Sequence, residues 1–324
     1  MNGSDNLTQS SLSCFSVPDS HLVLTVKIMA ILLVGGFAVF GNILIIFLAA
    51  RFTVKRNIHH LIINMAVSDI LIAVVFSYDL LTFLLRLPHL CDLWDNDVLA
   101  ITICTAAYYS FSNASMYVTL TSLLIISVER FRSTKVTVHR VRPYTMKKRL
   151  ALVSCSWLLP MGLSAHFAWY SQTEQPSTTE SITFFVLFCF GQLFVLLMMC
   201  LVVIFNIMTS FRLCKSRRTF PQGNFSNEQK RAREKQTAKA VKMVLCSTLL
   251  YTCCYLPGFL HFFYLALHFS RVFSVSPPYS SCTIDWNTLH FILDFLFLVN
   301  SCFSPCIYIV FLTEFRQAAK RLLH

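Results

Sequence analysis

The sequence predicts an all-α membrane protein, a bundle of seven transmembrane helices followed by a short amphipathic eighth helix. The first observation is composition: charged residues make up 13% of the chain, about half their share in an average soluble domain. The second is that apolar residues fall into seven long segments. The third is that basic residues concentrate in every second connection between those segments.

Each of the seven apolar segments is long enough for a spanning helix, which needs roughly 20 residues. After the seventh, apolar side chains lie on one side and basic side chains on the other, which predicts a helix on the inner membrane surface. We therefore expect an N-terminal tail over 1–26, a seven-helix domain over 27–311, and an amphipathic helix with a short tail over 312–324. The expected spanning segments are 27–50, 58–85, 98–129, 150–170, 181–211, 240–268 and 287–311.

The distribution of charge orients the bundle. With the N-terminus outside, 24 of the 27 basic residues fall inside, against Lys27, Arg86 and Arg271 outside, and membrane proteins accumulate positive charge on the cytoplasmic side. The net charge of +12 therefore indicates topology and attraction to lipid headgroups, not nucleic acid. Glycosylation sequons at Asn2 and Asn6 agree with an extracellular tail. We expect a multi-pass plasma-membrane protein.

Four of the thirteen cysteines lie outside or near the outer ends of helices, in an oxidising compartment. Four cysteines permit three pairings, and we favour Cys14–Cys282 together with Cys91–Cys104. The other nine cysteines lie in the apolar segments or face the cytosol, where most are expected to be small packing residues.

Polar groups at membrane depth are expensive and mark function. Asp69 lies in the middle of the second segment and Thr119 deep in the third, while Asn300 and Ser304 lie in the seventh. If the helices form one bundle, these groups surround a single polar site. A carboxylate with hydroxyl and amide oxygens suits a small hard cation such as sodium. The alternative is a protonated Asp69 that is merely hydrogen-bonded. No other metal and no other cofactor is expected.

Two further features concern movement. Glu129 lies beside Arg130 at the inner end of the third segment, where an acid can hold an arginine until another contact replaces it; the alternative is a snorkelling interfacial pair. Pro257 and Pro305 lie inside the sixth and seventh segments, and proline kinks a helix by removing a backbone hydrogen bond. These helices are expected to hinge, or else to carry the static kinks common in membrane helices.

Together these motifs resemble the rhodopsin-like (class A) G-protein-coupled receptors, over about 27 to 320 of the chain. The resemblance rests on several motifs in the right order and separation. They are Gly41-Asn42, the stretch from Asn64 to Asp69, Glu129-Arg130-Phe131, Trp157, the stretch Cys254-Tyr255-Leu256-Pro257, the stretch Ser304-Pro305-Cys306-Ile307-Tyr308, and Phe315.

The resemblance implies activation of a heterotrimeric G protein by an extracellular ligand. In this family a ligand shifts an existing equilibrium, the sixth helix swings outward about the residue matching Pro257, and Arg130 becomes free to meet the G protein. Pro305 and Tyr308 complete the implied switch, and Asp69 is the implied sodium ligand. The implied partners are the ligand, the G protein and membrane lipids.

The chain also departs from the family pattern. Residues 171–181 contain no cysteine for the usual disulfide, the fifth helix lacks its proline, and Ser304 replaces an asparagine. Phe205 or Asn206 stands near the place of a tyrosine that receives the freed arginine. Thr237 stands where an acid of the sixth helix would hold Arg130, so we expect elevated basal signalling.

The ligand is expected to be a basic peptide. Asp79 and Asp294 lie in the outer halves of the second and seventh segments, and Ser112 and Tyr255 match ligand-contacting positions of the family. The alternative for both acids is internal pairing, for example with Arg86 or a histidine. Acids also outnumber bases outside, which attracts a cation. The outer acids are Asp5, Asp19, Asp92, Asp95, Asp97, Glu174, Glu180 and Asp285.

Other readings stay open. The missing loop cysteine and missing proline resemble the branch of melanocortin, lysophospholipid and cannabinoid receptors, part of which binds lipids. A receptor-like protein that binds a ligand without signalling is a further alternative. A transporter is disfavoured because no internal repeat is visible, and an enzyme because no nucleophile, base and orienting group recur at meaningful spacing.

Overall fold

A computed structural model of the chain describes residues 20–51, 57–87, 98–135, 145–171, 178–219, 227–269 and 286–323. Every regular element in these ranges is a helix, as the sequence predicts. The helices are α2 (His21–Arg51), α3 (Asn57–Leu85), α4 (Val98–Lys135), α5 (Met146–Ser171), α6 (Thr178–Thr219), α7 (Asn227–Phe269), α8 (Trp286–Phe311) and α9 (Thr313–Leu323).

Local chemistry accounts for two of the helix ends. Ser20 precedes α2, and its hydroxyl accepts a hydrogen bond from the Val23 amide at 3.4 Å, which satisfies a donor that the helix start leaves unpaired. At the C-terminal end of α3, Arg86 has a positive φ of 53°. The Leu87 amide then donates to the Thr82 carbonyl at 3.0 Å, a pattern that closes helices whose last residue is left-handed.

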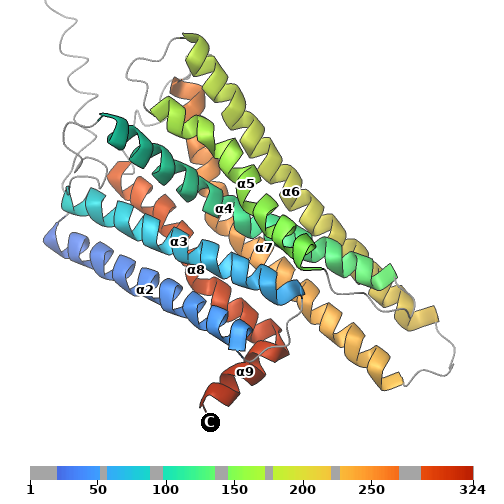
Figure 1. Cartoon of the computed structure of the whole chain (residues 1–324). Coiled ribbons are helices and arrows are strands. Elements are labelled where there is room, and N and C mark those ends of the chain that lie inside the picture. Colours follow the sequence, from blue (N-terminus) through green and yellow to red (C-terminus); the bar gives the residue numbers. More distant parts are fainter. Residues whose placement is uncertain are drawn as a thin grey trace, which may run out of the picture.

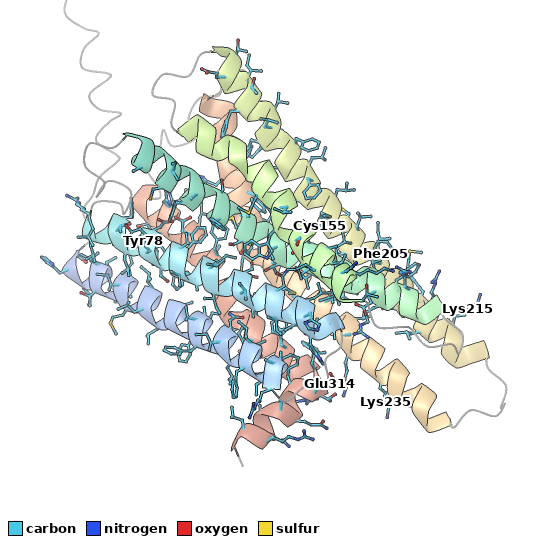
Figure 2. The ribbon with its side chains drawn as sticks, in the orientation of Figure 1. Tyr78, Cys155, Phe205, Lys215, Lys235 and Glu314 are labelled. Atoms are coloured by element: carbon cyan, nitrogen blue, oxygen red, sulfur yellow. The ribbon has the colours of Figure 1, made fainter. Side chains whose placement is uncertain are left out.

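The long helices form one bundle around α4, with α9 turned away from it at one end (Figure 1). α4 contacts α3, α5, α6 and α7, whereas α8 contacts α2, α3 and α7. Tyr78 lies toward one end of the bundle, and Lys215, Lys235 and Glu314 lie toward the other (Figure 2). Following the orientation expected from the sequence, we call the end with Tyr78 the outer end and the opposite end the inner end.

The helices cover all seven expected segments and extend beyond several of them. Six are long and apolar enough to cross a membrane, and α5 contains a shorter apolar stretch, Leu150–Gly162. α2 begins at His21 instead of 27, so Lys27 lies within the helix and is 7% exposed. α7 begins at Asn227 instead of 240. Hydropathy identifies only the part of a helix that lies in lipid, and a helix can continue into water.

Side-chain hydrogen bonds join the helices at their buried faces. Asn42 of α2 donates to the Ser301 carbonyl of α8 at 3.0 Å. Ser68 of α3 donates to the Ser115 carbonyl of α4 at 2.6 Å. Each bond satisfies a polar side chain that would otherwise be unpaired in a nonpolar interior.

Asn64 makes a larger junction. Its amide nitrogen donates to the hydroxyls of Ser122 on α4 and Ser156 on α5, both at 3.0 Å. Its oxygen accepts a hydrogen bond from the Trp157 indole at 2.8 Å. One side chain of α3 therefore holds α4 and α5 in place. The bond also shows that Asn64 and Trp157, two separate motifs in the sequence, are in direct contact in the fold.

Candidate functional site

The centre of the bundle holds a buried carboxyl group. Asp69 on α3 is fully buried, and the hydroxyls of Thr119, Ser301 and Ser304 face it. Neither Asp69 oxygen is hydrogen-bonded to another described residue. The two serine hydroxyls donate instead to carbonyls of their own helix, at 3.4 Å for Ser301 and 3.0 Å for Ser304. Their lone pairs stay available to an electropositive group.

Other unpaired polar atoms belong to side chains of the same region. The Thr119 hydroxyl, the Asn300 amide nitrogen and the Tyr308 hydroxyl are buried without a hydrogen-bond partner among the described residues. The Ser304 hydroxyl faces Tyr308, and Asn300 is 2% exposed. The four residues proposed from sequence therefore come from three helices, α3, α4 and α8, and Ser301 joins them.

This donor set fits a small hard cation. It offers one carboxylate and several neutral oxygens, the ligand chemistry that such cations prefer. A carboxylate buried without a positive partner is costly in a medium of low dielectric, so a bound cation or a proton must neutralise Asp69. The geometry fits the sodium interpretation and leaves the protonated alternative open.

An aromatic layer separates this centre from the outer part of the bundle. Tyr251 and Tyr255 of α7 stack with centroids 4.1 Å apart and an interplanar angle of 8°. Phe297 of α8 lies 4.7 Å from Tyr255 and 4.9 Å from Phe76 of α3. Tyr255 is fully buried, so the expected ligand contact belongs to a close-packed layer.

At the outer end, Asp294 pairs within its own helix. His290 Nδ1 lies 2.8 Å from Asp294 Oδ2, and the Asp294 residue is 8% exposed. Asp79 of α3 is close enough for its charge to act on His290, and Phe83 stacks on the same imidazole at 5.8 Å. The two acids expected to meet the ligand therefore converge on His290, and for Asp294 the structure shows the internal pairing that was the alternative.

Lys27 adds a buried cation to this end of the bundle. Its ammonium lies 3.4 Å from the Thr288 hydroxyl and 5.2 Å from the centre of the Phe291 ring. Its side chain therefore packs against α8. Ser112 lies within α4, and its side chain is outside the described set.

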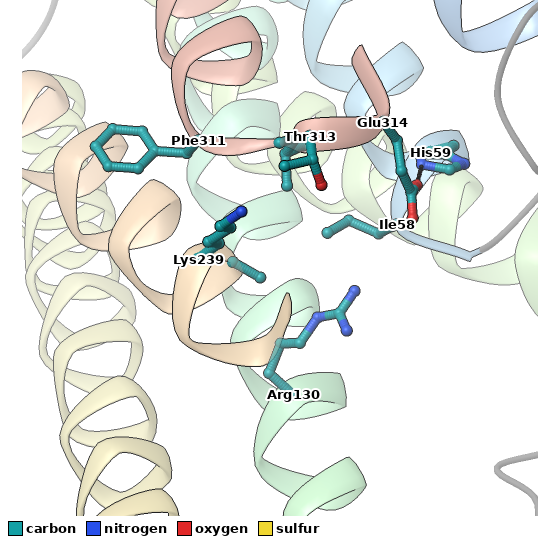
Figure 3. A pocket seen from close by; sticks show the side chains of 9 residues that line it. Ile58, His59, Arg130, Lys239, Phe311, Thr313 and Glu314 are labelled. Carbon is teal, nitrogen blue, oxygen red and sulfur yellow. Dashed lines mark ion pairs between the residues drawn. The ribbon is translucent and has the colours of Figure 1, made fainter. Parts of the chain in front are cut away.

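At the inner end, Arg130 lines a small pocket between α3, α4, α7 and α9 (Figure 3). The cavity holds about 20 Å³, room for about one water molecule. The sequence predicts that α7 lacks an acid to pair with Arg130. In the structure, Lys239 of α7 lines the same pocket, so this helix places a second cation there. The side chain of Thr237 lies outside the described set, so the expectation about that position stays a prediction.

An ion pair across the same pocket attaches α9 to α3. His59 Nε2 lies 2.6 Å from Glu314 Oε2, marked by the dashed line in Figure 3. Phe315 is fully buried, and its ring meets His59 edge-on at 5.7 Å. Sequence reasoning did not anticipate this pair, because the two residues are distant in the chain and neither belongs to a spanning segment's core.

The remaining switch residues lie on the expected helices. Pro257 lies within α7 and Pro305 within α8, and both helices continue through them. Pro305 packs against α2, since a Cβ at Gly41 would lie 3.0 Å from the proline ring. Tyr308 is fully buried and Glu129 is half-buried at the inner end of α4.

The lower half of α6 replaces the missing tyrosine with two different contacts. Phe205 meets Phe131 edge-on at 5.4 Å. Asn206 is fully buried and donates to the Ser127 hydroxyl at 3.0 Å and to the Val202 carbonyl at 2.7 Å. α6 therefore contacts α4 one turn from Arg130.

Cys104 forms a disulfide, as predicted for an outer cysteine. Its partner is not among the nine cysteines that the structure shows as free. The other three outer cysteines and both sequons lie outside the described residues, so the pairing and the glycosylation stay predictions. These residues are Asn2, Asn6, Cys14, Cys91 and Cys282.

Comparison with known proteins agrees with this architecture. The profile described as 7 transmembrane receptor (rhodopsin family) matches residues 41–308. Prokineticin receptor 1 from Bos taurus and from Homo sapiens are each 26% identical over 264 residues, which cover 74% of this chain and 61% of the relative. The alpha-1A adrenergic receptor of Mus musculus is 25% identical over 356 residues, covering 94% of this chain and 70% of the relative. The chain thus spans less than two thirds of the prokineticin receptors.

Proposed function

Because this chain belongs to the rhodopsin family of seven-transmembrane receptors, we propose that it binds an extracellular ligand and activates a heterotrimeric G protein. The family and the apolar helices make it a multi-pass plasma-membrane protein and a receptor, not an enzyme. We propose an extracellular tail over 1–26, a receptor domain over 27–311, and the amphipathic helix with a short tail over 312–324 inside.

The observation that carries the proposal is the pocket around Arg130. It lies at the end of the bundle with the most basic connections, and it is lined by α3, α4, α7 and α9 together. At about 20 Å³ it is too small to admit a segment of another protein. Signalling therefore requires the inner ends of these helices to separate, and Pro257 inside α7 is a place where that helix can bend.

The like charges of Arg130 and Lys239 bear on the resting state. Two cations that line one small pocket repel each other and favour separation of α4 from α7. An acid on α7 would have the opposite effect. This arrangement supports the expectation of elevated basal signalling.

For the ligand, we propose a cationic peptide. Asp79 and Asp294 both act on His290, so a ligand cation that replaced the imidazole would meet two carboxylates from α3 and α8. A buried carboxylate strongly prefers a charged partner over none. The named relatives include both prokineticin and adrenergic receptors, so their names do not share a ligand, and the assignment rests on this charge arrangement.

We further propose that Asp69, Thr119, Asn300 and Ser304 hold a sodium ion, with Ser301 beside them. The support is the buried, unpaired oxygens of Asp69 and Thr119, together with the Ser301 and Ser304 hydroxyls, which face Asp69 and keep lone pairs while donating to their own helix. The ion would supply the positive charge that the carboxylate otherwise lacks. The chain's own part is to keep these oxygens oriented toward one point.

The test is G-protein dissociation in cells that express the wild type, Arg130→Ala or Asp69→Asn at matched surface levels. Output from the wild type above mock-transfected cells, changed by either substitution, is the expected result. Asp294→Asn and Asp79→Asn should then weaken the response to cationic peptides.

A delipidated tissue extract separates ligand classes, because activity that survives lipid removal supports a peptide and activity that is lost contradicts one. No output from any variant, with or without a stimulating extract, would contradict signalling and leave a ligand-binding protein.

A further inference from the structure

The motif resemblance predicts that Tyr255 contacts the ligand, yet in the structure its side chain is enclosed by other side chains. The side chain is fully buried, and its hydroxyl has no hydrogen-bond partner among the described residues. The neighbouring Tyr251 is equally buried, but its hydroxyl donates to the Met116 carbonyl of α4 at 3.0 Å. Of the two stacked tyrosines, Tyr251 has a hydrogen-bond partner for its hydroxyl and Tyr255 has none among the described residues.

The ring of Tyr255 is held in place on several sides. Tyr251 stacks against it at 4.1 Å, Phe297 lies at 4.7 Å, and Phe259 lies at 6.1 Å. Phe297 comes this close to α7 because residue 258 is glycine: a Cβ there would lie 2.9 Å from the Phe297 ring. Close packing in rotamer minima leaves the hydroxyl little freedom to turn away.

The hydroxyl of Tyr255 lies near the polar centre. The Asn300 side chain faces it, and the charge of Asp69 acts on it. The Asn300 amide nitrogen is itself buried and unpaired. A phenol oxygen with free lone pairs thus adjoins the same group of unpaired atoms that surrounds the buried carboxyl group.

We propose that Tyr255 belongs to the buried cation site and supplies it with a neutral oxygen from α7, instead of contacting the extracellular ligand. The inference rests on the sodium site of the proposed function. It adds α7 to the three helices that furnish the other oxygens. Hydroxyl oxygens are suitable ligands for a hard cation. Cation binding then joins α7 to α3, α4 and α8 next to Pro257, on the inner side of that proline.

The experiment measures thermal unfolding of the purified full-length protein in detergent, with sodium chloride titrated against choline chloride at constant ionic strength. A ligand that binds only the folded state raises the unfolding midpoint, and the rise grows with the logarithm of the ligand concentration once that concentration exceeds Kd. The wild type should show a sodium-dependent rise, and Asp69→Asn should abolish it. Tyr255→Phe removes one oxygen and should shift the curve to about tenfold higher sodium, the equivalent of one hydrogen bond.

Tyr251→Phe is the matched control. It removes the same atom from the same aromatic stack, and it should lower the midpoint in choline while leaving the sodium dependence unchanged. Tyr255→Trp offers a second bulky ring without the phenol oxygen, should the phenylalanine variant fold poorly, and it should shift the sodium curve in the same direction.

The outcomes distinguish the role of Tyr255 from the existence of the cation site. A sodium curve for Tyr255→Phe that coincides with the wild type, while Asp69→Asn loses its response, overturns the role of Tyr255 alone. No sodium effect on the wild type, or an undiminished effect in Asp69→Asn, overturns the cation site itself. Neither result bears on G-protein dissociation, which tests the receptor function separately.

Discussion

Replacing Asn64 by alanine tests how strongly one side chain holds three helices together. The variant loses two donated bonds of 3.0 Å and one accepted bond of 2.8 Å. Interhelical hydrogen bonds in membranes average about 0.6 kcal/mol each, so the three together contribute roughly 2 kcal/mol. The Trp157 indole is also left without its acceptor, which adds about 1 kcal/mol or more.

We therefore expect Asn64→Ala to destabilise the protein by about 3 kcal/mol, since the two terms add. At about 2 °C per kcal/mol, the scale for larger domains, the unfolding midpoint should fall by roughly 6 °C. The assay is thermal unfolding of the purified protein in detergent, compared with Ser122→Ala and Ser156→Ala. Each of these removes one of the three bonds of Asn64 and should lower the midpoint by about a third as much or less; Ser156→Ala also removes a bond to the Val153 carbonyl within α5.

The reasoning is refuted if Asn64→Ala is no more destabilising than either serine variant. A second check uses Trp157→Phe as the background. There the indole donor is already absent, so Asn64→Ala should cost less than it does in the wild type. Equal costs in both backgrounds would show that the indole bond contributes nothing.

Three further predictions concern two residues of α7 and the start of α9. Gly258→Ala should lower the unfolding midpoint by the equivalent of about 1–3 kcal/mol, because its Cβ would lie 2.9 Å from the Phe297 ring; an unchanged midpoint would show that the ring can shift freely. Glu314→Ala should remove the ion pair with His59 and raise hydrogen exchange over 313–323, with Glu314→Asp as the milder control. Lys239→Glu should lower basal G-protein output by up to about fivefold, the effect of 1 kcal/mol in an exposed pair, and Lys239→Gln should lower it less. Output that rises in Lys239→Glu would contradict the charge argument.

Hydropathy predicted the helices well because the bilayer imposes a length and a composition on each. The same argument predicted the ends poorly. α6 continues to Thr219 and α7 begins at Asn227, although the flanking residues are polar. A helix needs only its backbone hydrogen bonds to continue past the membrane, and no apolar pattern records that continuation.

The sequence predicts a site residue when the free-energy cost of burying that residue in the membrane is high. A carboxyl group in an apolar segment must have a function or a partner, so Asp69 could be found from sequence. Tyr255 could not be assigned in this way, because a tyrosine presents an apolar ring and a polar tip and the sequence does not say where the tip points. The burial of Lys27 was not predictable for a related reason, since its long apolar stem lets it lie against α8.

Several bonds between helices end on a backbone carbonyl, which has a consequence for mutational tolerance. Asn42, Ser68 and Tyr251 are the donors, and the acceptors are carbonyls of α8 and α4. A carbonyl is present whatever the side chain at that position, so the acceptor positions can change while the bond persists. Only the donor position must keep a particular side chain for the hydrogen bond to form. Such one-sided bonds let a helical bundle accumulate substitutions on one helix without losing its register against the next, in keeping with relatives that share a quarter of their residues with this chain.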